Sequence, residues 1–138
     1  MSHRLIRSLF EARLAAWAAG REPSLRVAYQ NVSFTPAAGE TYLAAFALPA
    51  VTASNTLGGD DRLYTGVFQV NVVTPAGNGS GSAASIVDEL AALFPLYLKL
   101  TQGDFGVLVL TPVDPGPGIT ADTTYTIPAS FQYRADTE

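Results

Sequence analysis

The residues with the clearest chemical potential are glycines that lie between a strand-like and a helix-like segment. Gly77, Gly79 and Gly81 form the pattern Gly-x-Gly-x-Gly, and such loops can hold a phosphate at a helix N-terminus. A dinucleotide-binding loop needs a third glycine at position 82, which is Ser, and an acidic residue about twenty positions further on. A phosphate-binding loop needs a Lys followed by Ser or Thr, and no Lys is present here. We therefore interpret the stretch as a flexible connector.

Side chains that could carry out acid–base or metal chemistry are sparse. His3 is the only histidine and lies at the N-terminus, where we expect fraying, so a Ser-His-Asp arrangement has no suitable base. Asp60 and Asp61 are expected in a solvated loop, and Asp88 and Glu89 are helical neighbours that point about 100° apart. The absence of cysteine excludes disulfides, thiolate metal ligands and a cysteine nucleophile. The sequence predicts no enzymatic activity, no cofactor and no metal site.

Composition indicates one domain, residues 1–138, with ample material for a core. Hydrophobic residues make up 48% of the chain but charged residues only 14%, against roughly 25% in a typical soluble domain. Either the surface consists of small neutral side chains, or part of it is normally covered by a partner. The net charge of −4 disfavours nucleic acid and anionic membranes as partners, because both require a basic surface.

The N-terminal segment carries charges at Arg7, Glu11 and Arg13, unlike the uninterrupted apolar region of a secretory signal peptide. No apolar run approaches the roughly 18 residues of a membrane span. We therefore expect a protein that is made and used in the cytoplasm. The basic residues are concentrated in the first 26 positions, at Arg4, Arg7, Arg13, Arg21 and Arg26.

Hydrophobic periodicity predicts the elements that would position these residues. Apolar residues at three- and four-residue spacing predict a helix over 2–20, ended by Gly20 and Pro23, and a second over Ser82–Phe94. Alternating or strongly apolar segments predict strands at Leu25–Asn31, Thr41–Leu48, Arg62–Thr74, Phe105–Thr111 and Thr123–Arg134. This order indicates an α+β domain with a mainly antiparallel sheet of about five strands and two helices packed on one face.

Three interruptions of these strands carry further expectations. Gly66, inside a long strand, predicts a bulge or a close approach of the backbone. Pro128 predicts an edge strand or a bulge, because proline cannot donate a ladder hydrogen bond. The connection over residues 50–61 is long for a hairpin, and loops of that length are often functional or mobile.

Four stretches together resemble the tail terminator (tail completion) proteins of long-tailed bacteriophages and prophages, in particular the branch related to the lambda-type minor tail protein U. The resemblance rests on their order and spacing, since no single motif is diagnostic. With the N-terminal helix, it spans nearly the whole chain. The stretches are Val27–Leu43, Tyr64–Val72 followed by Pro75–Gly79, Ala91–Pro95, and Ile127–Arg134.

The resemblance implies a structural protein of the virion tail that is made in the bacterial host cytoplasm. Such proteins form a six-membered ring on the end of the tail tube, stop its polymerisation and offer the surface to which the head docks. The implied partners are other copies of the chain, the tail tube protein and the head–tail connector protein, with no nucleic acid and no membrane. Ring closure requires one surface patch to meet a different patch on the next subunit.

Within this interpretation we expect the loop from Thr52 to Arg62 to be one contact element, because a loop at the end of a sheet can reach a neighbouring subunit. The candidate contact residues are Thr52, Asn55, Leu57, Asp60, Asp61 and Arg62.

Two other classes of function stay open at the level of sequence. One is a small-molecule-binding or enzymatic α+β domain that uses the Gly77–Gly81 loop. The other is a toxin–antitoxin or regulatory module, which the acidic composition and the absence of a basic helix-turn-helix face disfavour.

Overall fold

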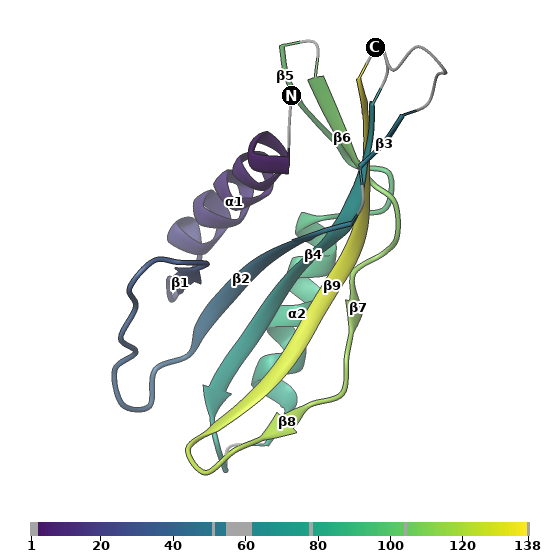
Figure 1. The fold of residues 1–138 in the computed structure, drawn as a ribbon. Helices are drawn as coiled ribbons and strands as arrows, with labels where there is room; N and C mark the ends of the chain where they lie inside the picture. The colour runs from purple at the N-terminus through teal and green to yellow at the C-terminus, as the bar shows by residue number, and fades with distance from the viewer. Residues whose placement is uncertain (1–2, 51, 55–61, 78, 104, 138) are drawn as a thin grey trace.

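A long, twisted sheet with two helices on one of its faces makes up the computed structural model, which describes residues 3–50, 52–54, 62–77, 79–103 and 105–137 (Figure 1). The helices are α1 (His3–Gly20) and α2 (Gly81–Leu93). The strands are β1 (Arg26–Tyr29), β2 (Tyr42–Pro49), β3 (Ala53–Ser54), β4 (Arg62–Pro75), β5 (Lys99–Gln102), β6 (Phe105–Val109), β7 (Asp114–Pro115), β8 (Ile119–Thr120) and β9 (Thr124–Thr137).

Two 14-residue strands, β4 and β9, form the centre of the sheet. They pair antiparallel over their whole length, from Arg62 opposite Thr137 to Pro75 opposite Thr124. The longer strands lie in the order β1-β2-β4-β9-β6-β5, while β3 pairs with β4, and β7 and β8 pair with β9. Every pair is antiparallel except β1 with β2, which is parallel.

The predicted α+β class and the mainly antiparallel sheet are confirmed, but the prediction of about five strands was wrong. The sheet described here has nine strands. The additional ones are β5, which has four residues, and β3, β7 and β8, which have two each. Segments so short show no hydrophobic period, so only their pairing with a longer strand defines them.

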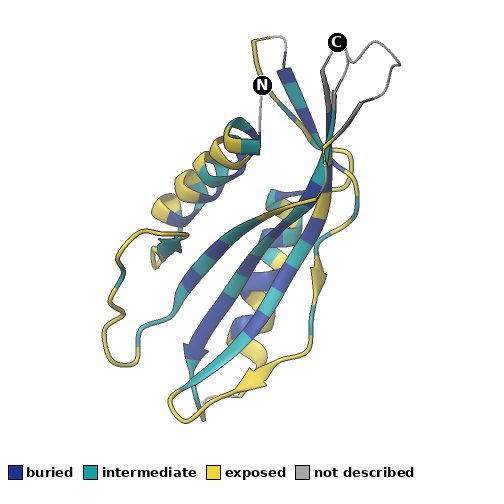
Figure 2. Cartoon of the chain, in the orientation of Figure 1, coloured by how far each residue is buried: buried dark blue, intermediate teal, exposed yellow. Residues whose placement is uncertain are grey.

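Both helices pack on the same face of the sheet, as the sequence predicts. The buried residues of α1 recur every four positions, at Ile6, Phe10, Leu14 and Ala18, which places them on one stripe. Phe10 and Phe94, the residue that follows α2, both contact Phe68 of β4 and Phe131 of β9. Figure 2 shows the resulting bands of buried and less buried residues along β4 and β9.

Five aromatic side chains fill the centre of the core. Ring centroids lie 5.2 Å apart for Phe10 with Phe68 and for Phe10 with Phe131, and 5.0 Å apart for Phe94 with Phe131. The Tyr133 ring lies 5.6 Å from Phe10. All five are at most 3% exposed. Because they come from α1, β4, β9 and the end of α2, this aromatic cluster joins segments that are far apart in the chain.

Gly66 permits a close approach inside the sheet, and the alternative of a bulge was wrong. The register runs without interruption through Thr65, Gly66 and Val67. A Cβ atom on Gly66 would lie 2.5 Å from the Tyr133 hydroxyl and 2.7 Å from the Leu48 carbonyl oxygen. The side chain of Tyr133 therefore crosses the neighbouring strand at the one position without a side chain.

Pro128 was predicted to mark an edge strand or a bulge, but β9 lies between β4 and the short strands. Pro128 pairs with Asn71 of β4, and its carbonyl accepts a hydrogen bond from the Gly116 N–H on the opposite side. In an antiparallel strand the N and C=O of one residue point to the same side. The missing N–H of Pro128 therefore faces the gap between β7 and β8, and no hydrogen bond to β4 is lost.

We expect Phe10→Ala to destabilise the protein by about 3–5 kcal/mol, because it removes a fully buried ring and leaves a cavity among four other aromatic side chains. The measurement is the free energy of unfolding from urea titration. Val32→Ala is the control, since Val32 is 61% exposed and should change stability by less than about 0.5 kcal/mol. Equal effects of the two substitutions would contradict the central role of the aromatic cluster.

We expect Gly66→Ala to cost about 1–3 kcal/mol, because the new methyl group must displace the Tyr133 hydroxyl and the Leu48 carbonyl. The matched control is Gly20→Ala, where a Cβ atom meets nothing within 4 Å. Thermal unfolding of both variants measures the difference, and a Gly66→Ala protein as stable as wild type would show that the strands can separate at no cost.

Candidate interaction surface

The face of the sheet that points away from the helices carries few charged residues. Its residues alternate along β2, β4 and β9 with those that face the core. On these three strands the outward-facing residues include Tyr42, Ala44, Phe46 and Leu48 of β2, Thr65, Val67, Gln69 and Asn71 of β4, and Pro128, Ser130, Gln132 and Arg134 of β9. The register also places Asp114 of β7 and Lys99 of β5 on this face.

An apolar row, formed by Leu48, Val67, Leu110 and Tyr97, crosses one end of this outer face. Leu48 lies opposite Val67, and Val67 lies opposite Gln132, a polar residue that separates Val67 from Leu110 in the row. The Leu110 N–H donates to the Gln132 carbonyl, and the Tyr97 N–H donates to the Val109 carbonyl. Leu48 is 46% exposed, Leu110 38% and Tyr97 67%. Clustered exposed apolar side chains of this kind are typical of contact surfaces.

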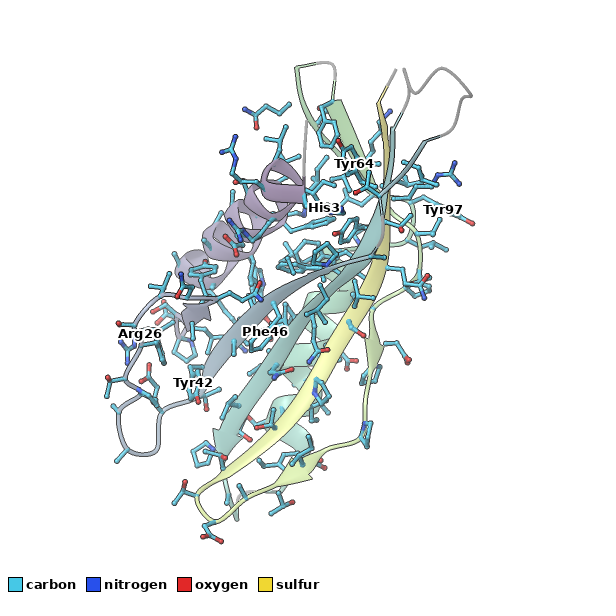
Figure 3. The ribbon with its side chains drawn as sticks, viewed as in Figure 1. His3, Arg26, Tyr42, Phe46, Tyr64 and Tyr97 are labelled. Atoms are coloured by element: carbon cyan, nitrogen blue, oxygen red, sulfur yellow. The ribbon has the colours of Figure 1, made fainter. Side chains whose placement is uncertain are left out.

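Tyr97 holds an unfavourable backbone conformation at the end of this row. Its φ is +67°, a left-handed value that is uncommon for a bulky residue and costs on the order of 1 kcal/mol. Burial does not offset this cost, because the ring projects into solvent beside β6 (Figure 3). Strain at an exposed aromatic residue is more typical of a functional position than of a structural one.

A depression of about 420 Å³ adjoins the apolar row, shares Val67 with it and is also lined by Gln132. It lies where the chain after β6 departs from β9, so that residues 111–113 lie opposite Phe131 alone. The Thr111 hydroxyl replaces the missing ladder acceptor, since it accepts the Gln132 N–H at 2.9 Å. Asp114 and Ser130 supply further polar groups to the lining.

His3 links the beginning of α1 to two other segments, although the sequence predicted a frayed residue. Its Nδ1 lies 3.2 Å from the Tyr133 hydroxyl and its Nε2 lies 2.9 Å from the Thr52 hydroxyl, both within hydrogen-bonding distance. The ring also meets Tyr64 edge-on, with centroids 5.1 Å apart. Burial lowers the pKa of His3 from its usual value. No sequence signal could reveal this link, because His3 and Tyr133 are separated by most of the chain.

The predicted contact loop from Thr52 to Arg62 is only partly described. Thr52 is exposed and contacts His3, and Ala53–Ser54 form β3 against β4, so this part of the expected loop is a strand. Arg62 begins β4. The structure therefore links Thr52 to the core-facing Tyr133 through His3. The remaining candidates, Asn55, Leu57, Asp60 and Asp61, lie outside the described residues.

The glycine-rich connector and the acidic helix pair each have a structural explanation. Gly77 and Gly79 have φ of +89° and +76°, which favours glycine in the turn before α2. Glu89 forms a 2.7 Å ion pair with Arg21, and this hydrogen-bonded partner lowers the pKa of Glu89. Asp88, its neighbour, is exposed. The pair ties α2 to the end of α1.

The described parts of the chain contain no group of three His, Cys, Asp or Glu side chains that could hold a metal ion. No helix among the described residues is both long and apolar enough to cross a membrane.

We expect the stability of the wild type relative to His3→Gln to fall as the pH drops through the range below about 6.5, the pKa of an unperturbed histidine. The folded state lowers the pKa of His3, so the unfolded chain binds the proton first and protonation favours unfolding. Urea titrations of the two proteins between pH 8 and 5 give the difference. A constant difference across this range would show that His3 titrates alike in both states.

Comparison with known proteins shows what this chain is similar to. A family model for the phage tail terminator protein matches residues 5–133. One solved structure has 48% sequence identity and a TM-score of 0.85, and the alignment covers 100% of this chain and 98% of the other. No curated protein is a significant match.

Proposed function

The chain belongs to the phage tail terminator family, and from this premise we propose that it forms a closed ring of six subunits on the end of the tail tube. The ring stops further polymerisation of the tube and presents the surface to which the head joins. Its partners are other copies of the chain, the tail tube protein and the head–tail connector protein. Family membership supports the coarser role, that of a structural component of the phage tail.

The finer assignments are part of the same proposal. The chain is related to the lambda-type terminator branch and is made in the cytoplasm of the bacterial host. It carries out no reaction, binds no cofactor, and acts through the geometry of its interfaces. The long Thr52–Arg62 segment remains a candidate contact element, since it leaves and re-enters the sheet at one end of β4.

The observation that carries this proposal is the outer face of the sheet, which has few charges and carries the apolar row. The two helices cover the inner face, so the outer face is the large sheet surface left for a partner. Its exposed leucine and tyrosine side chains gain free energy when they leave water, about 1.5–3 kcal/mol for each that is fully buried. The tail tube repeats one subunit around its axis. Its end therefore offers the outer face of each copy of the chain the same partner surface.

The test is the length of tail tubes that polymerise with and without the protein, measured by negative-stain electron microscopy. We expect wild type to bind tube ends as closed rings and to arrest growth. Leu48→Gln and Tyr97→Gln should each weaken end binding by roughly tenfold, which corresponds to about 1.4 kcal/mol.

The matched control is Val32→Gln, because Val32 is exposed and apolar but lies outside the outer face. It should cap tubes as wild type does. All three substitutions are at exposed positions, so unchanged thermal unfolding will separate lost binding from lost folding. Wild-type protein that neither binds tube ends nor changes tube length would overturn the proposed function. A rise in melting temperature with nucleotides or metal ions would favour the small-molecule alternative.

A further inference from the structure

We infer that His3 is a pH-sensitive latch, which holds the first turn of α1 and the Thr52 side chain against the central strands and opens when its ring is protonated. The latch consists of His3, Thr52, Tyr64 and Tyr133. Its opening is local, so the rest of the fold persists. This device is a property of the single chain, and it goes beyond the proposed role in the phage tail.

The His3 ring meets three other segments of the chain at once. Its Nδ1 lies 3.2 Å from the Tyr133 hydroxyl of β9, and its Nε2 lies 2.9 Å from the Thr52 hydroxyl. The ring of Tyr64 in β4 meets it edge-on. A neutral imidazole has one donor and one acceptor nitrogen, and a hydroxyl can serve either, so both polar contacts can form together. Figure 3 shows His3 and Tyr64 close together between the start of α1 and the central strands.

An extra residue in the chain beside β4 turns Thr52 toward the latch. The last pair of β2 is Pro49 with Gly66, and the first pair of β3 is Ala53 with Leu63. Three residues of one strand thus connect positions that two residues connect on the other, as at a β-bulge. Plain alternation from β2 would place Thr52 on the outer face of the sheet. The extra residue reverses this, so the Thr52 hydroxyl reaches the imidazole on the face that the helices cover.

The two segments that the latch joins belong to the parts of a fold that open most readily. One is the beginning of α1, where the first N–H groups have no partners within the helix. The other is the chain that leads from Thr52 into β3, a strand of two residues. Helix ends and short edge elements open at a lower free energy than a packed core. The latch can therefore open while the aromatic cluster stays packed.

The surroundings of His3 favour its neutral form. Burial lowers the pKa of its ring. His3 is the first residue of α1, where the partial positive charge of a helix N-terminus opposes a cation. The charged residues nearest to it on that helix, Arg4 and Arg7, are themselves cations. From the sheet it is faced by the phenols of Tyr64 and Tyr133, and burial raises the pKa of Tyr133.

Protonation of His3 therefore opens the latch. In the open state the ring is in water and titrates near pH 6.5, whereas the closed state keeps it neutral to a lower pH. The contribution of the latch is complete above about pH 6.5 and is lost as the pH falls toward the lower pKa of the closed state. At pH 5.5 the ratio of open to closed molecules exceeds its neutral value by at most about tenfold.

The experiment measures hydrogen–deuterium exchange of the full chain by mass spectrometry, in peptides that cover the first turn of α1, β3 and α2. Wild type and His3→Gln are compared at the same pH, so the intrinsic pH dependence of exchange cancels. At pH 7.5 we expect His3→Gln to exchange roughly tenfold faster than wild type in the first two peptides. At pH 5.5 this difference should shrink, because wild type opens too. The α2 peptide should exchange alike in both proteins.

A second variant tests whether the two segments open together. Thr52→Val keeps the shape of the side chain and removes the hydroxyl, so it should speed exchange in the first turn of α1, 49 positions away in the chain. The matched control is Thr120→Val, an exposed position in β8, which should leave α1 as in wild type. A ratio of His3→Gln to wild-type exchange that stays constant with pH, or a Thr52→Val variant with unchanged α1 exchange, would overturn the inference.

The titration of His3 gives an independent check, since the only histidine of the chain yields a single imidazole signal in NMR. Its midpoint should lie below pH 6.5 in the native protein and near 6.5 in urea. A native midpoint at or above 6.5 would also overturn the latch. None of these measurements uses tail tubes, so a protein that opens as expected but caps no tubes would keep the latch and lose the proposed function.

Discussion

The packing of Phe10 against the centre of the sheet is the interaction on which the rest of the structure depends. Its ring contacts Phe68, Phe94, Phe131 and Tyr133, so it joins α1 to both central strands and to the end of α2. Aromatic pairs of this kind each contribute about 0.5–1.5 kcal/mol beyond the area they bury. Because this cluster holds both helices on one face, the other face of the sheet is left to meet partners.

The distribution of charged residues follows from the same difference between the two faces of the sheet. Two ion pairs secure connections within the chain, Arg21 with Glu89 and Arg26 with Glu40. The Arg26 hydrogen bonds and the Ala37 N–H hold the pKa of Glu40 at about 2. The strands of the outer face carry Thr, Gln, Asn and Ser between apolar residues. Charged residues are therefore few on the surface that is proposed to be covered on assembly.

The edges of the sheet direct assembly toward side-chain contacts. Beyond β1, the Gln30 side-chain oxygen accepts the Ala47 N–H that would otherwise be open on β2, and Pro49 follows at the end of that strand. On the far side of β9, Pro112, Pro115 and Pro117 interrupt the segment that carries β7 and β8. These stretches are therefore poorly suited to pairing with another strand, which favours association through side chains.

Local patterns were sufficient for part of this description. Apolar residues three or four positions apart define the buried stripes of α1 and α2, and alternation defines β4 and β9. A few neighbouring positions are enough to show the period of a regular element. The order of segments also identified the family. The short strands β3, β5, β7 and β8, the parallel pairing of β1 with β2, the link from His3 to Thr52 and Tyr133, and the apolar row all required the tertiary structure. Each joins positions that are distant in the chain, and the strand register that brings them together is set by the packing of the whole sheet and by no local pattern.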